Sequence, residues 1–168
     1  MRTGVALGSN LGNRLANLRA GHKAITGLAG VAPPFLSSPI YETDPIGCEP
    51  GAGKFLNAVL EFDYNGQPAD LLERLIGIEE SLGRERDHAR NVSRQIDIDL
   101  LYAGQMRIDT KRLQLPHPRL HLRRFVLQPL ADIRAELILP GQTKTVRELL
   151  AQVADSGKVE RQTDCELA

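Results

Sequence analysis

The most regular pattern of apolar and polar positions lies at residues 55–64, FLNAVLEFDY. Apolar side chains occupy every second position there, which is the period of a β-strand. Shorter runs at 3–8 (TGVALG) and 95–102 (QIDIDLLY) predict two further strands. The segment 36–43, LSSPIYET, is expected to be extended, and Pro39 places it at a sheet edge or a bulge.

A helical period appears between these strands. Apolar residues recur three and four positions apart over 14–29, with Asn13 as the expected N-cap. The segment 67–83 shows the same spacing, and Pro68 in its first turn and Gly83 at its end are typical helix boundaries. Two further helices are expected near the C-terminus, at 125–133 and 143–154.

The predicted order is strand, helix, strand, strand, helix, strand. This order is typical of an α+β, ferredoxin-like βαββαβ core, to which the C-terminal helices are additions. The chain has 168 residues, the size of one ordinary domain, and VAPPF at 31–35 is expected to break the chain without separating two domains. We therefore expect a single domain over 1–168.

Charge is distributed unevenly along the chain. The formal net charge is zero, which argues against a general nucleic-acid binder, yet residues 84–124 carry ten Lys or Arg against five Asp or Glu. A basic segment in a neutral protein favours binding of one compact polyanion. Cys48 and Cys165 lie far apart with no CxxC spacing, and the N-terminus has no signal-peptide pattern, so reduced thiols in the cytoplasm are expected.

The acidic pair Asp97 and Asp99 is the first candidate for chemistry. Side chains alternate along a strand, so both carboxylates point to one face, with Cα atoms ~6.6–7 Å apart. Oxygen ligands at this separation suit Mg²⁺, which takes its remaining ligands from water and substrate phosphates. On this pair alone, a solvated strand face is an equally good interpretation.

Arginines surround this acidic pair in the sequence and make phosphate chemistry the better interpretation. They are Arg84, Arg86, Arg90 and Arg94 before it and Arg112, Arg119, Arg123 and Arg124 after it, with His117 among them. Arginine presents a planar fork of donors that matches phosphate oxygens. Metal and cations together are what phosphoryl-type transfer needs. GAGKF at 51–55 lacks P-loop spacing and LGSNLG at 7–12 is not GxGxxG, so ATP would bind in another way.

Six segments form a recognisable combination: ALGSNLG at 6–12, YETDPIG at 41–47, FLNAV at 55–59, IEESLGRER at 78–86, RQIDIDLL at 94–101 and LPHPRLHLRRFVLQPL at 115–130. In this order they resemble the 6-hydroxymethyl-7,8-dihydropterin pyrophosphokinases of folate biosynthesis. The resemblance covers nearly the whole chain, and the combination of the last two motifs is specific. It implies transfer of the β,γ-pyrophosphoryl group of ATP to the pterin hydroxymethyl group, with two Mg²⁺ ions and AMP as a product.

The resemblance also implies site residues, position by position. Asp97 and Asp99 would hold both metal ions, and Arg84 and Arg94 would join them as catalytic residues. The implied ATP-binding residues are Glu79, Arg84, Arg86, Arg90, Arg94, Arg112, His117 and Arg123. The implied pterin-binding residues are Thr43, Asp44, Ile46, Phe55, Asn57 and Phe125. The two phenylalanine rings would enclose the pterin, and the Asn57 amide would form hydrogen bonds with the polar atoms at the edge of the pterin ring.

Four positions depart from the family pattern. Asn91 stands where relatives can have tryptophan, so we expect residues 84–93 to form a lid that closes less tightly over the substrates. The other departures are Ile76, Gln114 and Pro118, which lie on the expected adenine side.

Two other functions stay open on the residues alone. One is a metal-dependent nuclease or other phosphotransferase that uses Asp97 and Asp99; the other is a ferredoxin-like RNA-binding module. The RNA-binding module requires aromatic residues on the central strands, and TGVALG and QIDIDLL contain none. We expect a monomeric, cytoplasmic, Mg²⁺-dependent pterin pyrophosphokinase that binds ATP and a dihydropterin, and neither nucleic acid nor membrane.

Overall fold

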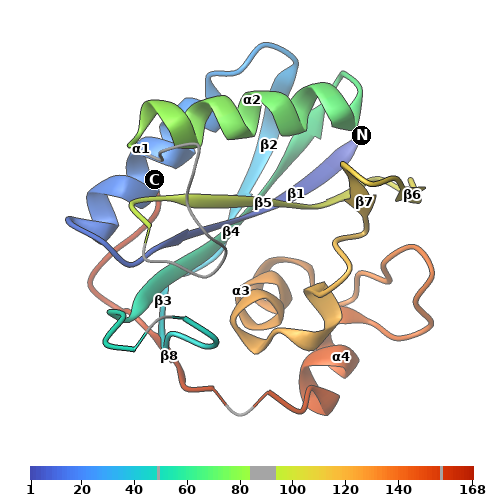
Figure 1. The fold of residues 1–168 in the computed structure, drawn as a ribbon. Helices are drawn as coiled ribbons and strands as arrows, with labels where there is room; N and C mark the ends of the chain where they lie inside the picture. Colours follow the sequence, from blue (N-terminus) through green and yellow to red (C-terminus); the bar gives the residue numbers. More distant parts are fainter. Residues whose placement is uncertain (49, 84–93, 156) are drawn as a thin grey trace.

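The computed structural model describes residues 1–48, 50–83, 94–155 and 157–168, which form an antiparallel sheet with helices on both faces (Figure 1). The strands of the sheet are β1 (Arg2–Ser9), β2 (Val31–Ser37), β3 (Tyr41–Thr43), β4 (Phe55–Tyr64), β5 (Asp97–Ala103) and β8 (Val159–Arg161). The helices are α1 (Arg14–Thr26), α2 (Pro68–Ser81), the 3₁₀ turn η1 (Leu120–Leu122), α3 (Arg124–Arg134) and α4 (Val146–Gln152). A separate hairpin joins β6 (Ile108–Asp109) to β7 (Gln114–Leu115).

Strand β4 lies at the centre of the sheet. Within the described residues the strand order is β5-β1-β4-β3-β8, and β2 also pairs with β4. All these pairs are antiparallel. Strands β2 and β3 can share β4 because they meet different parts of it, with Leu36 opposite Glu61 and Tyr41 opposite Asn57. Strand β5 is left at one edge of the sheet.

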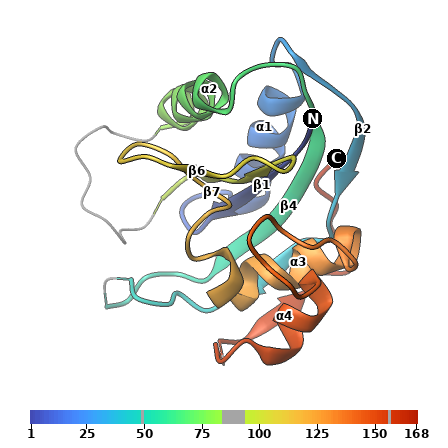
Figure 2. The same ribbon diagram turned by 90° about the vertical axis from the view of Figure 1, so that its right-hand side faces the viewer.

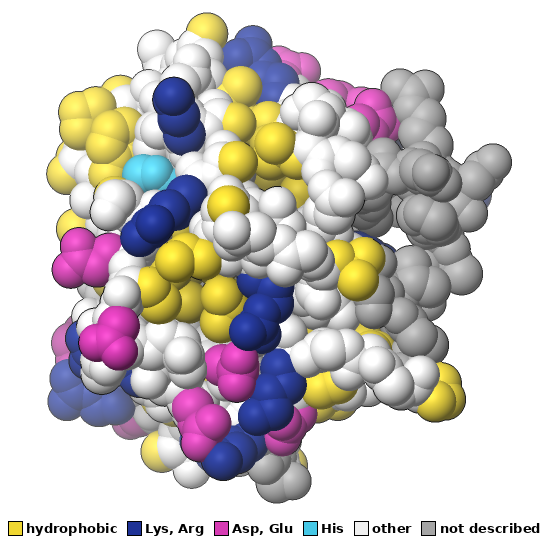
Figure 3. Space-filling model, turned by 90° about the vertical axis from the view of Figure 1, so that its left-hand side faces the viewer, with side chains coloured by type: hydrophobic (Ala, Val, Ile, Leu, Met, Phe, Trp, Pro, Cys, Tyr) yellow, Lys and Arg dark blue, Asp and Glu magenta, His cyan; other side chains and the backbone are white. Residues whose placement is uncertain are grey.

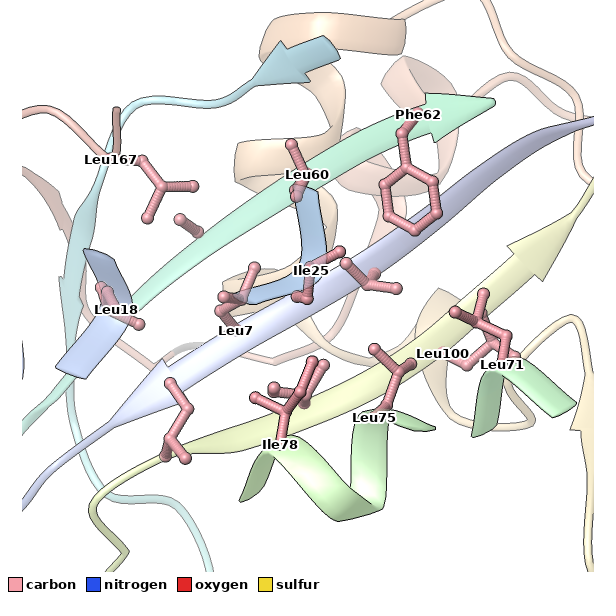
Figure 4. Packing of buried hydrophobic residues seen from close by; sticks show 14 of the residues in the cluster. Leu7, Leu18, Ile25, Leu60, Phe62, Leu71, Leu75, Ile78, Leu100 and Leu167 are labelled. Carbon is pink, nitrogen blue, oxygen red and sulfur yellow. The ribbon is translucent and has the colours of Figure 1, made fainter. Parts of the chain in front are cut away.

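Helices cover both faces of this sheet, α1 and α2 on one side and α3 with α4 on the other (Figures 1 and 2). On the first face, Ile25, Leu75 and Ile78 point from their helices toward the strands (Figure 4). A second cluster joins Val59 and Leu101 of the sheet to α3 and α4. Each fully buried aliphatic side chain of this kind stabilises the fold by about 1.5–3 kcal/mol.

Because both faces are covered, the polar positions of β4 are not all solvated. Glu61 is fully buried, and its carboxylate accepts hydrogen bonds from Arg2, at 2.6 and 2.8 Å, and from the Tyr102 hydroxyl. Arg134 of α3 lies 3.4 Å from the same carboxylate. These contacts join β1, β4, β5 and α3 at the end of the sheet where β1 begins.

The mixed helix and antiparallel-sheet architecture expected from the sequence is confirmed. The prediction that VAPPF breaks the chain was wrong, because Val31–Ser37 is a strand. Its pairing with β4 is irregular between Ala32 and Leu36, which is how a strand tolerates two prolines. Strand β8 was not predicted, since three residues that pair only at a sheet edge leave no periodic pattern.

Helix boundaries follow the expected capping chemistry. The Asn13 side chain accepts a hydrogen bond from the Ala16 N–H at 3.0 Å and begins α1. Gly83 follows the last turn of α2 with φ +105°, a conformation that favours glycine. The predicted helix at 143–154 is shorter than expected and begins after Thr145, which forms a capping box with Glu148.

Basic and acidic side chains lie interspersed with small apolar areas on the face seen in Figure 3. No helix among the described residues is both long and apolar enough to cross a membrane.

Candidate active site

One row of residues crosses the sheet from its edge to its centre. Asp97 of β5 lies opposite Gly8 of β1, and Gly8 lies opposite Asn57 of β4. Directly paired residues project from the same face of a sheet. Val59, two residues from Asn57 on β4, packs with α3, so this row lies on the face that α3 covers. Strands are ~4.8 Å apart, which places the backbones of Asp97 and Asn57 ~10 Å from each other. Gly8 has no side chain, so none projects from β1 between the carboxylate and the amide.

Asp97 and Asp99 share this face, as the strand alternation predicts. Arg94 pairs with the Asp97 carboxylate, and the Arg123 guanidinium lies 3.5 Å from the Asp99 carboxylate. Both acids are partly exposed, with 29% and 36% of their side-chain surfaces accessible. The expected combination of carboxylates and arginines is therefore present around β5.

The charge state of Asp99 reflects its crowded surroundings. Burial, and then the neighbouring charge of Asp97, raise the pKa of Asp99 to about 6 from its ordinary 3.8, although Arg123 and Arg94 oppose the rise. Two close carboxylates on one face of a strand suit a hard divalent cation. Among the described residues, no group of three or more His, Cys, Asp or Glu could hold a metal ion. A cation at this pair would need further ligands from water or a phosphate.

Glu79 reaches the strand that carries both acids. Its side chain is 2% exposed, and Oε1 accepts a hydrogen bond from the Ile98 N–H at 2.7 Å. Ile98 lies between the two aspartates, and its N–H points to the outer edge of β5, where the described part of the chain has no neighbouring strand. Glu79 therefore fixes the backbone from which both carboxylates project. The family resemblance predicts Glu79 as an ATP-binding residue, and nothing in the sequence indicates this contact with the backbone of β5.

A bulge in β5 places His117. Gly4 pairs with Tyr102 and Val5 pairs with Leu100, so Leu101 is an extra residue on β5. The Leu101 carbonyl accepts a hydrogen bond from the His117 N–H at 2.7 Å. This contact fixes the loop that follows β7 against the edge of β5.

The His117 ring is a neutral hydrogen-bonding group. Burial, together with the charges of Arg123 and Arg119, lowers its pKa to about 4. Nδ1 accepts a hydrogen bond from the Arg119 N–H at 3.2 Å, so the ring proton lies on Nε2. At neutral pH, His117 can donate one hydrogen bond without adding charge.

A cavity of about 210 Å³ lies beside Asp99 at the edge of the sheet. Leu72, Leu100 and Leu113 supply apolar walls, and Gln114 and His117 supply polar groups. The lining also contains Lys111, Arg112, Ile98 and Pro118. An apolar slot with a few polar groups, next to two acids, suits a flat base attached to phosphates. Ile76 is 36% exposed and does not line this cavity.

Arg112 lies at the rim of this cavity. It pairs with Glu73 at 2.5 Å, and three quarters of its side-chain surface is exposed. The predicted ATP-binding residues Arg84, Arg86 and Arg90, like Asn91 and the rest of the predicted lid at 84–93, lie outside the described residues.

The predicted pterin-binding residues gather at the other end of the row. Asn57 is 7% exposed, and its amide donates a hydrogen bond to the Thr43 hydroxyl at 2.6 Å. A Cβ on Gly8 would lie 2.9 Å from Asn57 Oδ1 and 3.7 Å from the Phe55 ring. Thus Asn57 and Phe55 both lie over the backbone of Gly8.

Phe125, Asp44 and Ile46 complete the predicted pterin set. Phe125 is half-buried in the first turn of α3, with the Arg123 guanidinium 5.4 Å from the centre of its ring. Asp44 and Ile46 follow β3, and Ile46 is 54% exposed. Thr43 pairs directly with Phe55, so the two segments that carry these residues are adjacent.

Asn10 is a site residue that sequence reasoning did not single out. Its Oδ1 accepts a hydrogen bond from the Arg94 N–H at 2.6 Å, and its amide donates one to the Gly53 carbonyl at 3.3 Å. The backbone N–H of Asn10 also donates to the Arg94 carbonyl at 3.1 Å. Asn10 therefore joins the arginine beside Asp97 to the loop before β4. Its place in ALGSNLG was the available signal, but the motif does not reveal the contacts.

Comparison with known proteins identifies relatives of this chain. The sequence profile described as 7,8-dihydro-6-hydroxymethylpterin-pyrophosphokinase (HPPK) matches residues 4–135. The chain is 43% identical over 129 residues to a 2-amino-4-hydroxy-6-hydroxymethyldihydropteridine pyrophosphokinase of Bacillus subtilis, covering 77% of this chain and 75% of that protein. It is 39% identical over 155 residues to the protein of the same name from Pseudomonas aeruginosa, covering 89% and 90%.

A solved structure of wild-type HPPK-DHPS from Plasmodium falciparum with pteroate has a similar fold. The TM-score is 0.68 at 14% identity, and the match covers 90% of this chain and 42% of the Plasmodium chain. The present chain thus spans less than half of that protein, and the likeness concerns the fold alone. On the profile match and the sequence identities, the chain belongs to the 7,8-dihydro-6-hydroxymethylpterin-pyrophosphokinase family.

Proposed function

We propose that this protein transfers the β,γ-pyrophosphoryl group of ATP to 6-hydroxymethyl-7,8-dihydropterin in folate biosynthesis. The hydroxymethyl oxygen attacks the β-phosphorus, and the bond from this phosphorus to the α,β-bridging oxygen breaks. AMP leaves with the bridging oxygen, and the hydroxyl proton is released. The observation that carries the proposal is the row Asp97, Gly8 and Asn57, because it places an acidic pair and a buried amide on one face of the sheet, with the backbones of Asp97 and Asn57 ~10 Å apart.

Asp97 and Asp99 would hold two Mg²⁺ ions together with the phosphates of ATP. Metal held by these two carboxylates would supply positive charge where negative charge develops during transfer. The position of Asp99 beside Asp97, whose charge adds to the effect of burial in raising the Asp99 pKa, supports this assignment. Glu79, which accepts a hydrogen bond from the Ile98 N–H, would fix the strand backbone from which both carboxylates project.

Arg94 and Arg123 would bind the phosphates from either side of the acids. Each already contacts one carboxylate, so each can exchange this partner for a phosphate oxygen when metal ions occupy the acids. Arg84, Arg86, Arg90 and Arg112 belong to the same proposal on the basis of the family resemblance, with Arg84 and Arg94 as catalytic residues.

The cavity beside Asp99 would take the adenine and ribose of ATP. Its apolar walls suit a base, and the neutral His117 can donate a hydrogen bond from Nε2. At the other end of the row, Phe55 and Phe125 would enclose the pterin ring and Asn57 would read its edge. Thr43 would orient Asn57, and the backbone near Asp44 and Ile46 would supply further hydrogen bonds.

We also propose that the chain is one domain with a ferredoxin-like core and acts as a cytoplasmic monomer without nucleic-acid partners. The neighbouring strands β5-β1-β4-β2 support the fold assignment, because they correspond to the fourth, first, third and second strands of a βαββαβ unit.

The test is product analysis with purified protein, ATP, Mg²⁺ and the dihydropterin. AMP and the pterin diphosphate should form in equal amounts, and no AMP should form without pterin. Asp97→Asn should abolish both products while the protein stays folded. AMP formation that does not depend on pterin, or release of ADP in its place, would refute the proposal and favour another phosphotransferase or a nuclease.

A further inference from the structure

Helix α3 carries part of the proposed pterin site on its first turn but does not cap itself. It begins at Arg124, with Phe125 as its second residue, and the N-cap residue Arg123 makes no side-chain capping hydrogen bond. The first N–H groups of a helix need acceptors from elsewhere. An acceptor that fixes this turn also fixes the position of Phe125 on it.

Asp155, 31 residues further along the chain, supplies this acceptor. Its Oδ2 accepts a hydrogen bond from the Arg124 N–H at 3.1 Å, and its backbone carbonyl accepts one from Arg124 Nε at 3.0 Å. A carboxylate at a helix N-terminus is also favoured by the helix dipole. The other carboxylate oxygen, Oδ1, accepts from the Gly157 N–H at 2.8 Å. Both carboxylate oxygens of Asp155 therefore accept hydrogen bonds from backbone N–H groups.

The segment that follows Asp155 reaches the other wall of the proposed pterin site. A Cβ on Gly157 would lie 2.5 Å from Ile46 Cδ1, so the two residues are in close contact. The Asp44 N–H donates to the Lys158 carbonyl at 3.4 Å. Next, β8 pairs with β3 and places Val159 opposite Thr43. Figure 1 shows β8 beside β3 at the edge of the sheet.

We propose that Asp155 is a positioning residue for pterin binding, which joins the first turn of α3 to the loop that carries Asp44 and Ile46. The inference rests on the proposed function. Asp155 lies beyond residue 135, where the family profile ends, so the family match does not assign it a role. Without Asp155, Phe125 and Ile46 would no longer be held at a fixed separation, and the pterin would have to order them as it binds.

The test compares Asp155→Ala with Thr145→Ala, which removes the cap of α4. The Thr145 hydroxyl accepts from the Glu148 N–H at 3.2 Å, so both variants lose one helix-capping group. Within the described residues, Thr145 pairs with Glu148 and Ile138, neither of which belongs to the proposed site. Calorimetric titration would measure pterin affinity in the presence of Mg²⁺ and a nonhydrolysable ATP analogue, and the affinity for the analogue alone. Thermal unfolding would measure stability.

Asp155→Ala should weaken pterin binding roughly fivefold to tenfold, as expected from losing one helix cap, and change the affinity for the analogue less than about twofold. Asp155→Ser, which keeps one capping oxygen, should recover part of the loss and serves as the test if the alanine variant does not fold. Thr145→Ala should lower the melting temperature and leave pterin affinity unchanged.

Equal pterin affinity in wild type and both Asp155 variants would overturn the inference, as would an equal loss in Thr145→Ala. These outcomes leave the proposed function intact, because the wild-type protein still binds pterin. A wild-type protein that binds no pterin would overturn the proposed function and this inference together.

Discussion

Replacement of Asp99 by asparagine should stabilise the metal-free protein while abolishing its activity. Burial and the charge of Asp97 raise the pKa of Asp99 from 3.8 to about 6. The ionised carboxylate therefore destabilises the folded state near neutral pH when no cation is bound. Asparagine has a similar shape and no charge, so it removes this unfavourable interaction together with the proposed metal ligand.

The magnitude follows from the pKa shift and from the exposure of the side chain. A rise from 3.8 to about 6 corresponds to an upper value of about 3 kcal/mol at pH 7. Because 36% of the Asp99 side chain is exposed, solvent screens the interaction, and a gain of about 1 kcal/mol is expected. For a chain of this size, such a gain raises the melting temperature by about 2–4 °C.

The pH dependence separates this cause from an ordinary packing effect. The pKa of the folded-state carboxyl is raised, so the destabilisation is absent below pH 3.8, grows between pH 3.8 and about 6, and is complete above that range. Chelator-treated Asp99→Asn and wild type would be unfolded in urea at about pH 7.5 and about pH 4.5, with exposed Asp164→Asn as a control. The stability gain should shrink at the lower pH. A variant that is less stable than wild type at pH 7.5, or a gain that does not vary with pH, would refute the reasoning.

Three further predictions concern other parts of the structure. Glu61→Ala should lower the free energy of unfolding in urea by about 2–3 kcal/mol, because it removes the acceptor of the buried Tyr102 hydroxyl and the carboxylate that Arg2 and Arg134 contact. Gly8→Ala should raise the KM for pterin roughly tenfold in steady-state assays, since its methyl group would displace the Asn57 amide. Asn10→Ala should lower kcat roughly tenfold in the same assays with little change in the KM for ATP, because Arg94 loses the contact that orients its backbone.

Each of these predictions has a matched comparison. For Glu61, activity per folded molecule should stay near the wild-type value, and loss of activity without loss of stability would contradict the structural role. Gly77→Ala, which meets no atom within 4 Å, should not affect pterin binding, and an effect equal to that of Gly8→Ala would remove the steric argument. Asn13→Ala removes the cap of α1 only, so it should not reproduce the kcat defect of Asn10→Ala.

Period-2 alternation was sufficient to place Asp97 and Asp99 on one face of a strand, because local backbone geometry alone decides which way they point. The family resemblance correctly identified the family. The register that aligns Asp97, Gly8 and Asn57 could not be predicted, since it depends on pairing between three strands distant in the sequence.

Contacts made by single side chains with a distant backbone were also invisible in the sequence. Glu79 reads as one more polar residue of an amphipathic helix, and only packing of α2 against β5 brings it to the Ile98 N–H. Asp155 belongs to a short connection without periodicity, so no pattern relates it to Arg124. The strand at Val31–Ser37 was missed because local proline chemistry opposed it and pairing with β4 prevailed.

Strand β5 ends the sheet, and unpaired backbone at such an edge invites pairing with another chain. At this edge the Glu79 carboxylate accepts a hydrogen bond from the Ile98 N–H, and the His117 N–H donates one to the Leu101 carbonyl. The charges of Asp97 and Asp99 further discourage a second strand from approaching. Two residues of the proposed ATP site, Glu79 and His117, thus also occupy backbone groups that a further strand would need for pairing.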